Sequence, residues 1–173
     1  MDALRGGALV APAACLLAEL AAVPSSTLPL AAAGAVSRLV ALLGDDACEG
    51  PEAGARALAH MCAGGDTLRA MVVGAGGVPP LVRMACGGGE AAAAEAARCL
   101  GALGAAPAAA EAIRAAGGVD ALGVLLQVRA AHPNVRAWRY AYPDACAQTG
   151  GPAAREVALA ALTTIVAPPV QGV

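Results

Sequence analysis

A block of residues recurs along this chain at a step of 41 to 42 residues. Gly34, Gly76 and Gly117 mark equivalent positions in three copies, and each is followed two residues later by a valine and five residues later by a leucine. These anchor residues are not alanine, so the alanine-rich composition alone does not explain their common register. Self-similarity at this period indicates a solenoid, in which each unit buries its apolar faces against its neighbours.

A second block repeats with the same step. ARALAHM, from Ala55 to Met61, matches ARCLGAL, from Ala97 to Leu103, 42 residues further on. Residues 14–20 and 157–162 occupy the equivalent places upstream and downstream. The Leu-x-x-Leu spacing within these segments puts two large apolar residues on one face of a helix. Each unit is therefore predicted to end in a long helix.

The best-defined unit is predicted to contain three helices, over residues 66–74, 78–86 and 90–104. The glycines at 74, 76 and 77 end the first helix, because glycine readily adopts the positive φ of a sharp turn. Pro79 and Pro80 fit the first turn of the second helix, where no intrahelical N–H bond is needed. The glycines at 87–89 then reverse the chain into the third helix.

Composition supports an all-α fold. Hydrophobic residues form 58% of the chain but aromatic residues only 2%, with no Phe, so the apolar residues are mainly Ala, Leu and Val. The formal net charge of −2 is not typical of a protein that binds DNA or RNA. The longest uncharged run, residues 20–37, contains prolines and hydroxyl residues and predicts no membrane span. A signal or transit peptide is the rival interpretation of the apolar start, which Asp2 and Glu19 disfavour.

Six cysteines are present, without a Cys-x-x-Cys pair or zinc-ligand spacing. In so apolar a chain we interpret them as buried, reduced thiols. This favours an intracellular protein, and the predicted location is the cytoplasm or the nucleus.

The pattern Gly-(Gly/Ala)-Val-x-x-Leu followed by Ala-Arg-x-Leu-x-x-Leu resembles armadillo repeats. The resemblance implies one right-handed α-solenoid of three to four repeats over residues 1–173. The predicted units are a partial repeat at 8–33 and repeats at 34–75, 76–116 and 117–166, with ends that look truncated. HEAT repeats are the nearest alternative, but they generally lack the separate short helix and glycine turn.

The resemblance also implies a function. Third helices of armadillo proteins line a concave groove that binds extended peptides, and most members are interaction scaffolds rather than enzymes. In nuclear-import receptors of this family the groove carries a repeated Trp-Ala-Leu-x-Asn pattern. The tryptophan places are here taken by Cys15, Arg56, Arg98 and Val157, and the asparagine places by Glu19, His60, Ala102 and Ala161. Recognition of basic import signals is therefore not expected.

The candidate groove residues are Glu19, Arg56, His60 and Arg98. Arg56, His60 and Arg98 together form a small basic patch that would pair with acidic side chains or a phosphate of a partner protein or peptide. The alternative is that the two arginines are solvated residues on helix faces.

A second candidate site is an insertion of about 18 residues in the last unit, at about 128–150. It holds every aromatic residue of the protein, next to several arginines, a composition typical of binding hot spots. A loop that shields an apolar edge and a platform for single-stranded nucleic acid are the alternatives. The residues predicted to contact a partner are Arg136, Trp138, Arg139, Tyr140 and Tyr142.

No motif for catalysis, a metal or a cofactor was found. GGGEAA, at residues 87–92, has the spacing of a dinucleotide-binding turn but lacks the preceding strand. We therefore expect a non-catalytic scaffold or adaptor. The alternatives are an accessory or substrate-binding region of a larger enzyme, such as a ubiquitin ligase, and a self-associating structural element.

Overall fold

The computed structural model describes residues 10–44, 50–87, 89–125 and 152–166, and these ranges contain helices but no strand. The helices are α1 (Val10–Ala21), α2 (Pro24–Ala32), α3 (Ala35–Leu43), α4 (Pro51–Ala63), α5 (Asp66–Gly74), α6 (Val78–Gly87), α7 (Glu90–Gly104), α8 (Pro107–Ala115), α9 (Gly118–Leu125) and α12 (Pro152–Val166).

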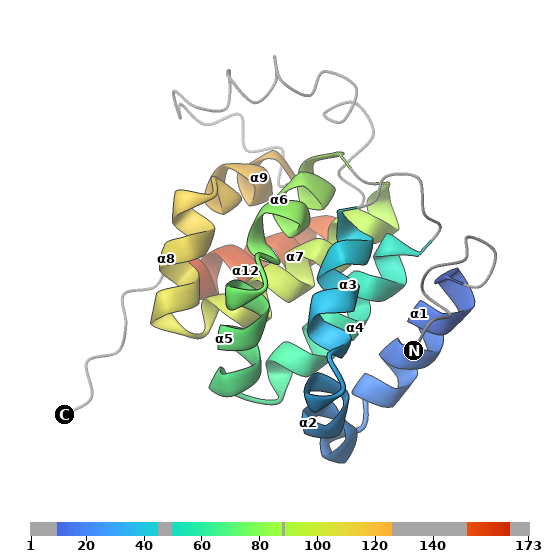
Figure 1. Cartoon of the computed structure of the whole chain (residues 1–173). Coiled ribbons are helices and arrows are strands. Elements are labelled where there is room, and N and C mark those ends of the chain that lie inside the picture. Colours follow the sequence, from blue (N-terminus) through green and yellow to red (C-terminus); the bar gives the residue numbers. More distant parts are fainter. Residues whose placement is uncertain (1–9, 45–49, 88, 126–151, 167–173) are drawn as a thin grey trace.

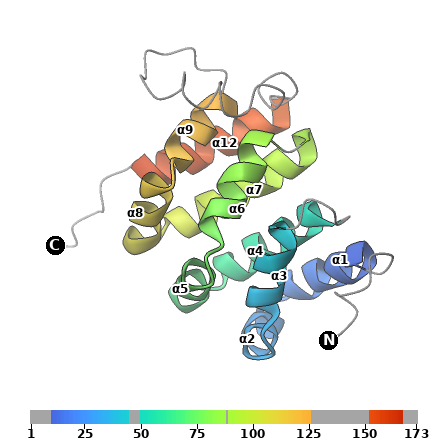
Figure 2. The same ribbon diagram turned by 45° about the horizontal axis from the view of Figure 1, so that its top comes forward.

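The helices form rows that run along a solenoid (Figure 1). Four helices, α1, α4, α7 and α12, follow one another side by side and are called here the third-helix row. A second row of α3, α6 and α9 packs on α4, α7 and α12 respectively, and the short helices α2, α5 and α8 complete the units. Figure 2 shows α1 at one end of the molecule and α12 towards the other. The prediction of an all-α solenoid is confirmed.

The repeated glycines form the corner of each unit. Gly34, Gly76 and Gly117 have φ values of 78°, 75° and 77°, in the left-handed region that glycine adopts without steric cost. At the first two corners the flanking helices, α2 with α3 and α5 with α6, meet at 85° and 83°. The prediction that these glycines turn the chain between two helices is confirmed.

The predicted helix boundaries in the central unit are also confirmed. The structure gives α5 and α7 the expected limits, and α6 extends one residue beyond them, to Gly87. Pro79 and Pro80 lie in the first turn of α6, and Pro24, Pro51 and Pro107 each begin a helix. Proline is accepted there because its missing N–H has no intrahelical partner at that position.

The core is built from leucines at equivalent places and from small residues between adjacent helices. Leu39, Leu81 and Leu122 are at most 1% exposed, and burial of such a side chain stabilises the fold by about 1.5–3 kcal/mol. Adjacent third helices approach closely: a Cβ added to Gly101 would lie 3.0 Å from the Cβ of Ala161. One added to Gly104 would lie 2.5 Å from Cγ1 of Ile165. Glycine at both places therefore lets α7 and α12 pack together.

The terminal helices of the row differ from the central ones. Leu58 of α4 and Leu100 of α7 are fully buried, but their equivalent in α12, Leu159, is 56% exposed. The reason is position, since α4 and α7 each have a third helix on both sides, and α12 contacts only α7 within the described row. The buried side of α12 is formed instead by Ala158, Ala161 and Ile165.

The residue that follows each corner glycine varies together with the residue five positions before it. A Cβ added to Gly77 would lie 2.8 Å from Cγ1 of Val72, and one added to Gly118 would collide with Cγ2 of Ile113. The first copy has Ala35 at this position, and the residue equivalent to Val72 there is Leu30, which has no branch at Cβ. A β-branched residue five positions earlier thus accompanies glycine, and a leucine accompanies alanine.

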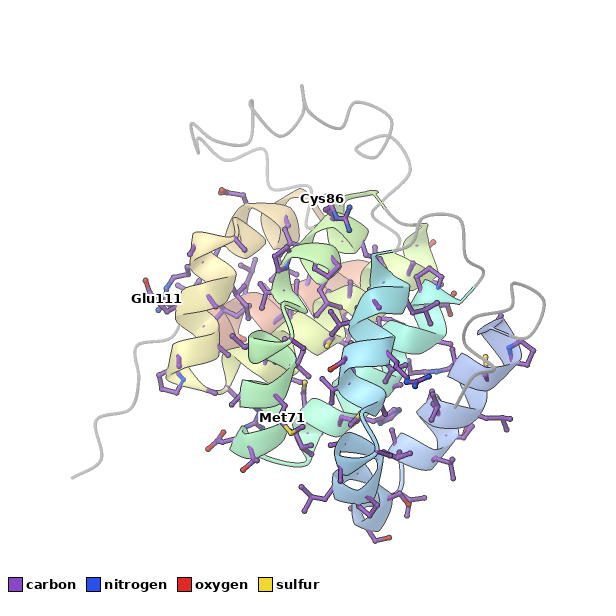
Figure 3. All side chains as sticks on the ribbon, in the orientation of Figure 1. Met71, Cys86 and Glu111 are labelled. Carbon is purple, nitrogen blue, oxygen red and sulfur yellow. The ribbon has the colours of Figure 1, made fainter. Side chains whose placement is uncertain are left out.

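The cysteines are buried in part. Cys62, Cys86 and Cys99 are buried thiols, as predicted, and Cys86 lies near the end of α6 (Figure 3). The prediction is wrong for Cys15, which is exposed on α1. Cys48 and Cys146 lie outside the described residues.

Cys62 and Cys99 join α4 to α7 in the core. A hydrogen bond between their thiols raises the pKa of Cys99 well above its ordinary value, with further contributions from burial, from Cys62 and from the charge of Glu95. Neutral Cys99 is therefore the form compatible with the fold.

No single helix in the described ranges is long and apolar enough to cross a membrane. Two bent pairs, α2 with α3 and α5 with α6, meet the length and composition criteria only when each pair is taken together.

Gly76→Ala is expected to lower the free energy of unfolding by roughly 1–2 kcal/mol, because a Cβ disfavours the left-handed conformation. Gly74→Ala is the matched control: Gly74 lies in α5 without a positive φ, and a Cβ there meets nothing within 4 Å. That variant should match the wild type or gain up to about 1 kcal/mol, because alanine favours helix. Urea unfolding measures both, and equal effects of the two substitutions would contradict the assigned corner.

The raised pKa of Cys99 predicts that the free energy of unfolding falls as the pH rises above about 8.5. There the unfolded chain loses the thiol proton, whereas the folded chain keeps it, so alkaline pH favours unfolding by at most about 1.4 kcal/mol per pH unit. Urea unfolding between about pH 7 and pH 9.5 should show a steeper fall for the wild type than for Cys99→Ala. Parallel pH profiles would refute a buried neutral thiol at this position.

Candidate interaction surface

The predicted groove residues lie on three consecutive helices of the third-helix row. Glu19 is on α1, Arg56 and His60 are on α4, and Arg98 is on α7. α4 packs against both α1 and α7, so the repeat places Arg56 and Arg98 at equivalent positions of adjacent helices. Among the described residues, no hydrogen bond or ion pair joins any two of these four side chains.

Arg56 is half-buried, and its Nε is shielded from solvent without a hydrogen-bond partner within the described part of the chain. An N–H donor that is removed from water and left unpaired costs about 1–3 kcal/mol.

Arg98 is more accessible, with half of its side-chain surface exposed. Its Nη1 lies 3.4 Å from Oε2 of Glu95, one helical turn earlier on α7. The side chain of Glu95 is only 12% exposed, and this oxygen has no hydrogen bond among the described residues. Glu95 therefore partly neutralises Arg98 through an ion pair, without a hydrogen bond between the two side chains.

Glu95 was not among the residues predicted from the sequence. The available signal was its spacing of three residues before Arg98, which places opposite charges side by side on a helix. The repeat pattern does not indicate Glu95, because the equivalent residue of α4 is Ala53 and the acidic residue is therefore not repeated.

The other two predicted residues take different positions. His60 is half-buried in the last turn of α4. Glu19 is exposed, whereas its equivalent in α12, Ala161, packs against α7; among the described residues no third helix precedes α1. Glu19 thus lies at the end of the described row.

The second candidate site cannot be placed. Arg136, Trp138, Arg139, Tyr140 and Tyr142 all lie outside the described residues, so their contact with a partner stays a prediction.

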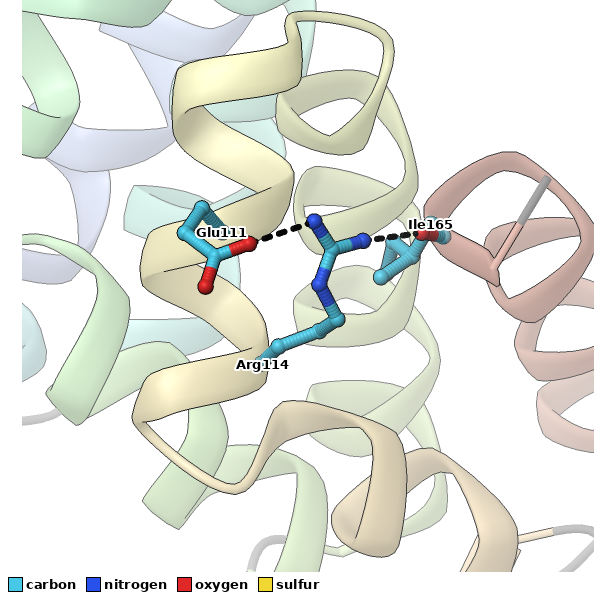
Figure 4. Close-up of polar contacts among 3 residues, drawn as sticks. All are labelled: Glu111, Arg114 and Ile165. Atoms are coloured by element: carbon cyan, nitrogen blue, oxygen red, sulfur yellow. Dashed lines mark hydrogen bonds and ion pairs between the residues drawn. The ribbon is translucent and has the colours of Figure 1, made fainter. Parts of the chain in front are cut away.

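A polar contact that the sequence did not predict joins α8 to α12 (Figure 4). Arg114 donates from Nη1 to the backbone carbonyl of Ile165 at 2.9 Å, and its Nη2 lies 2.7 Å from Oε2 of Glu111. Carbonyl groups in the last turn of a helix lack intrahelical partners, and a cation there is also favoured by the helix dipole. Arg114 therefore links the C-terminal end of α12 to α8, which is a structural role.

Within the described ranges, no group of three or more His, Cys, Asp or Glu side chains could hold a metal ion. The chemistry that the third-helix row offers is instead charge-assisted hydrogen bonding from guanidinium groups, which suits carboxylate and phosphate acceptors.

No protein-family model matches the sequence, and no curated protein matches it. Solved structures do match. An engineered protein from the Northeast Structural Genomics Consortium is 29% identical, with a TM-score of 0.75 over 95% of this chain and 59% of its own. The chain therefore spans less than two thirds of that protein.

Two designed proteins are similar at lower identity. One crystal structure is of computationally designed armadillo repeat proteins for modular peptide recognition, with 21% identity and a TM-score of 0.76 over 96% of this chain and 62% of the other. A designed armadillo repeat protein in complex with the peptide (KR)4 is 19% identical, with a TM-score of 0.66 over 95% and 78%. Together with the stacked helix triplets and their glycine corners, these likenesses show that the chain has an armadillo-like repeat fold.

Proposed function

We propose that the protein is a non-catalytic interaction scaffold, which binds an extended peptide of a partner protein along the third-helix row. The support from similar proteins is that designed armadillo repeat proteins recognise peptides, one of them the basic peptide (KR)4. The cytoplasm or the nucleus remains the predicted location.

The observation that carries the proposal is the pair of arginines at equivalent positions of α4 and α7. Arg56 is half-buried and forms no ion pair among the described residues, and Arg98 is half exposed beside a single carboxylate. Guanidinium groups bind carboxylates and phosphates through paired N–H donors. The partner segment is therefore proposed to be acidic or phosphorylated, in contrast to the basic peptide of the designed protein.

The spacing of the helices fits an extended peptide. Packed helices lie about 8–10 Å apart, which sets the separation expected between equivalent positions on α4 and α7. Residues two apart in an extended chain point to the same side and are about 7 Å apart. Two acidic residues in an x-acidic-x-acidic pattern would thus reach Arg56 and Arg98 with little adjustment of these long side chains.

A fluorescein-labelled peptide with glutamate at alternate positions tests the proposal by fluorescence anisotropy, with the glutamine version as the neutral control. Arg56→Glu combined with Arg98→Glu should weaken binding by at least about 100-fold, since hydrogen bonds to charged groups contribute about 1.5–3 kcal/mol each. Wild-type affinity should also fall with added salt, as expected for partly exposed charges. Unchanged affinity in the double variant, or no preference for the acidic peptide, would reject the proposal.

Two further variants separate a local effect from a change in net charge. Arg83→Glu alters the charge as much as Arg98→Glu does, but Arg83 is exposed on α6, outside the third-helix row. It should bind the acidic peptide nearly as the wild type does. Glu95→Gln keeps the shape of the side chain and removes the charge opposed to Arg98, so it should tighten binding. Weaker binding by Glu95→Gln would mean that Glu95 positions Arg98 rather than competing with the peptide.

A further inference from the structure

The two ends of the third-helix row carry exposed apolar side chains. On α1, Leu16 is 66% exposed and Leu20 is 50% exposed, and Val23, just after the helix, is 48% exposed. On α12, Leu159 is 56% exposed and Val166 is 59% exposed. These residues are called here the α1 end face and the α12 end face.

The interior of the same molecule shows what covers these positions when a neighbour is present. The equivalents of Leu16 are Ala57, Cys99 and Ala158, which are all fully buried and lie on helices that have a preceding helix in the row. The equivalents of Leu159 in α4 and α7, Leu58 and Leu100, are fully buried in the core of the row. Each of these positions lies on a helix that packs against another third helix of this chain.

The packed pair α7–α12 defines the two sides of this contact. The leading helix, α7, offers Gly101 and Gly104, and the following helix meets them with Ala161 and Ile165. By the repeat, the leading side of α12 has Ala160 and Thr163 at these places, both exposed. The following side of α1 has Glu19 and Val23. Small residues on α12 can thus meet larger ones on α1, as in the interior contact.

Glu19 is the one charged residue at these matched places. Its equivalents His60 of α4 and Ala102 of α7 are half-buried, whereas its equivalent in α12, Ala161, is 2% exposed and lies against Gly101 of α7. The position is therefore covered to a different extent in each copy. A glutamate there can keep its carboxylate in water while its CH₂ groups cover apolar surface.

We propose that the chain associates with copies of itself end to end, with the α12 end face of one copy stacked on the α1 end face of the next. The contact repeats between molecules the packing of α7 on α12 within one molecule. Because the two faces differ, each pair leaves one face of each kind open, so association is head-to-tail and continues beyond a dimer. Equivalence to buried positions, rather than exposure alone, selects the second copy as the occupant.

Sedimentation velocity and light scattering on the full chain test this proposal. The average mass of the wild type should rise with concentration without a plateau at the dimer. Leu16→Glu and Leu159→Glu should each lower self-association by on the order of 100-fold, because each would bury an unpaired carboxylate in an apolar contact. Both leucines are exposed, so circular dichroism and thermal unfolding should match the wild type.

A mixture of the two variants distinguishes head-to-tail stacking from other modes. Leu16→Glu retains an intact α12 end face, and Leu159→Glu retains an intact α1 end face. Each variant alone should be monomeric, and the equimolar mixture should form a heterodimer that does not grow. If α1 instead paired with α1, Leu159→Glu would still dimerise alone, and that result overturns the proposal.

Leu28→Glu is the matched control. Leu28 is 61% exposed on α2, but its equivalents, Ala70 and Glu111, are exposed as well, so no contact between units covers this position. This variant should associate like the wild type. The proposal is overturned if the wild type stays monomeric at the highest attainable concentration, if Leu28→Glu abolishes association, or if the mixture stays monomeric.

Discussion

Close packing between successive third helices is the interaction on which the other features of this structure depend. Gly101 and Gly104 let α7 approach Ala161 and Ile165, and the chain uses small residues along the whole row. Small side chains lose little conformational entropy on burial, and they let dispersion contacts extend over long stretches of helix. A solenoid with almost no aromatic residues can therefore still form a continuous core. The same packing sets the separation of the arginines on α4 and α7.

The sequence was sufficient to predict features that recur in each copy. The corner glycines require a positive φ wherever a short helix turns sharply into the next, so Gly34, Gly76 and Gly117 could be interpreted before the structure was known. The helices around Pro79 and Glu90 followed from rules of the same local kind. These features depend on a few adjacent residues, which is why their limits were predicted closely.

Burial at the ends of the row could not be predicted in the same way. The Leu-x-x-Leu pattern identifies an apolar side of a helix, but whether that side is covered depends on a neighbour that the pattern does not contain. Leu159 and Leu100 have the same repeat position and opposite exposure for this reason. Cys15 was expected to be buried on composition alone, but it takes the same repeat position as Arg56 and Arg98, which is half-buried or exposed on the central helices as well.

The candidate site also contains some features that the repeat predicts and others that it does not. The repeat correctly put Arg56 and Arg98 at equivalent places on adjacent helices, because their positions follow from the backbone. The ion pair of Arg98 with Glu95 was missed, because it exists in one copy and depends on side-chain conformation. The inserted aromatic residues have no counterpart in another copy, so nothing in the repeat predicts where they lie.

Differences between copies are nevertheless informative when two of them change together. Val72 with Gly77 and Ile113 with Gly118 occur in the copies where a Cβ after the corner would collide with a branched side chain. Leu30 with Ala35 occurs in the copy where the branch is absent. The two positions share one space: where the residue before the corner is branched at Cβ, the residue after the corner is glycine, and where it is leucine, the residue after the corner is alanine. The repeat therefore conserves the volume at the corner rather than the residue, and a search for identical residues alone overlooks this constraint.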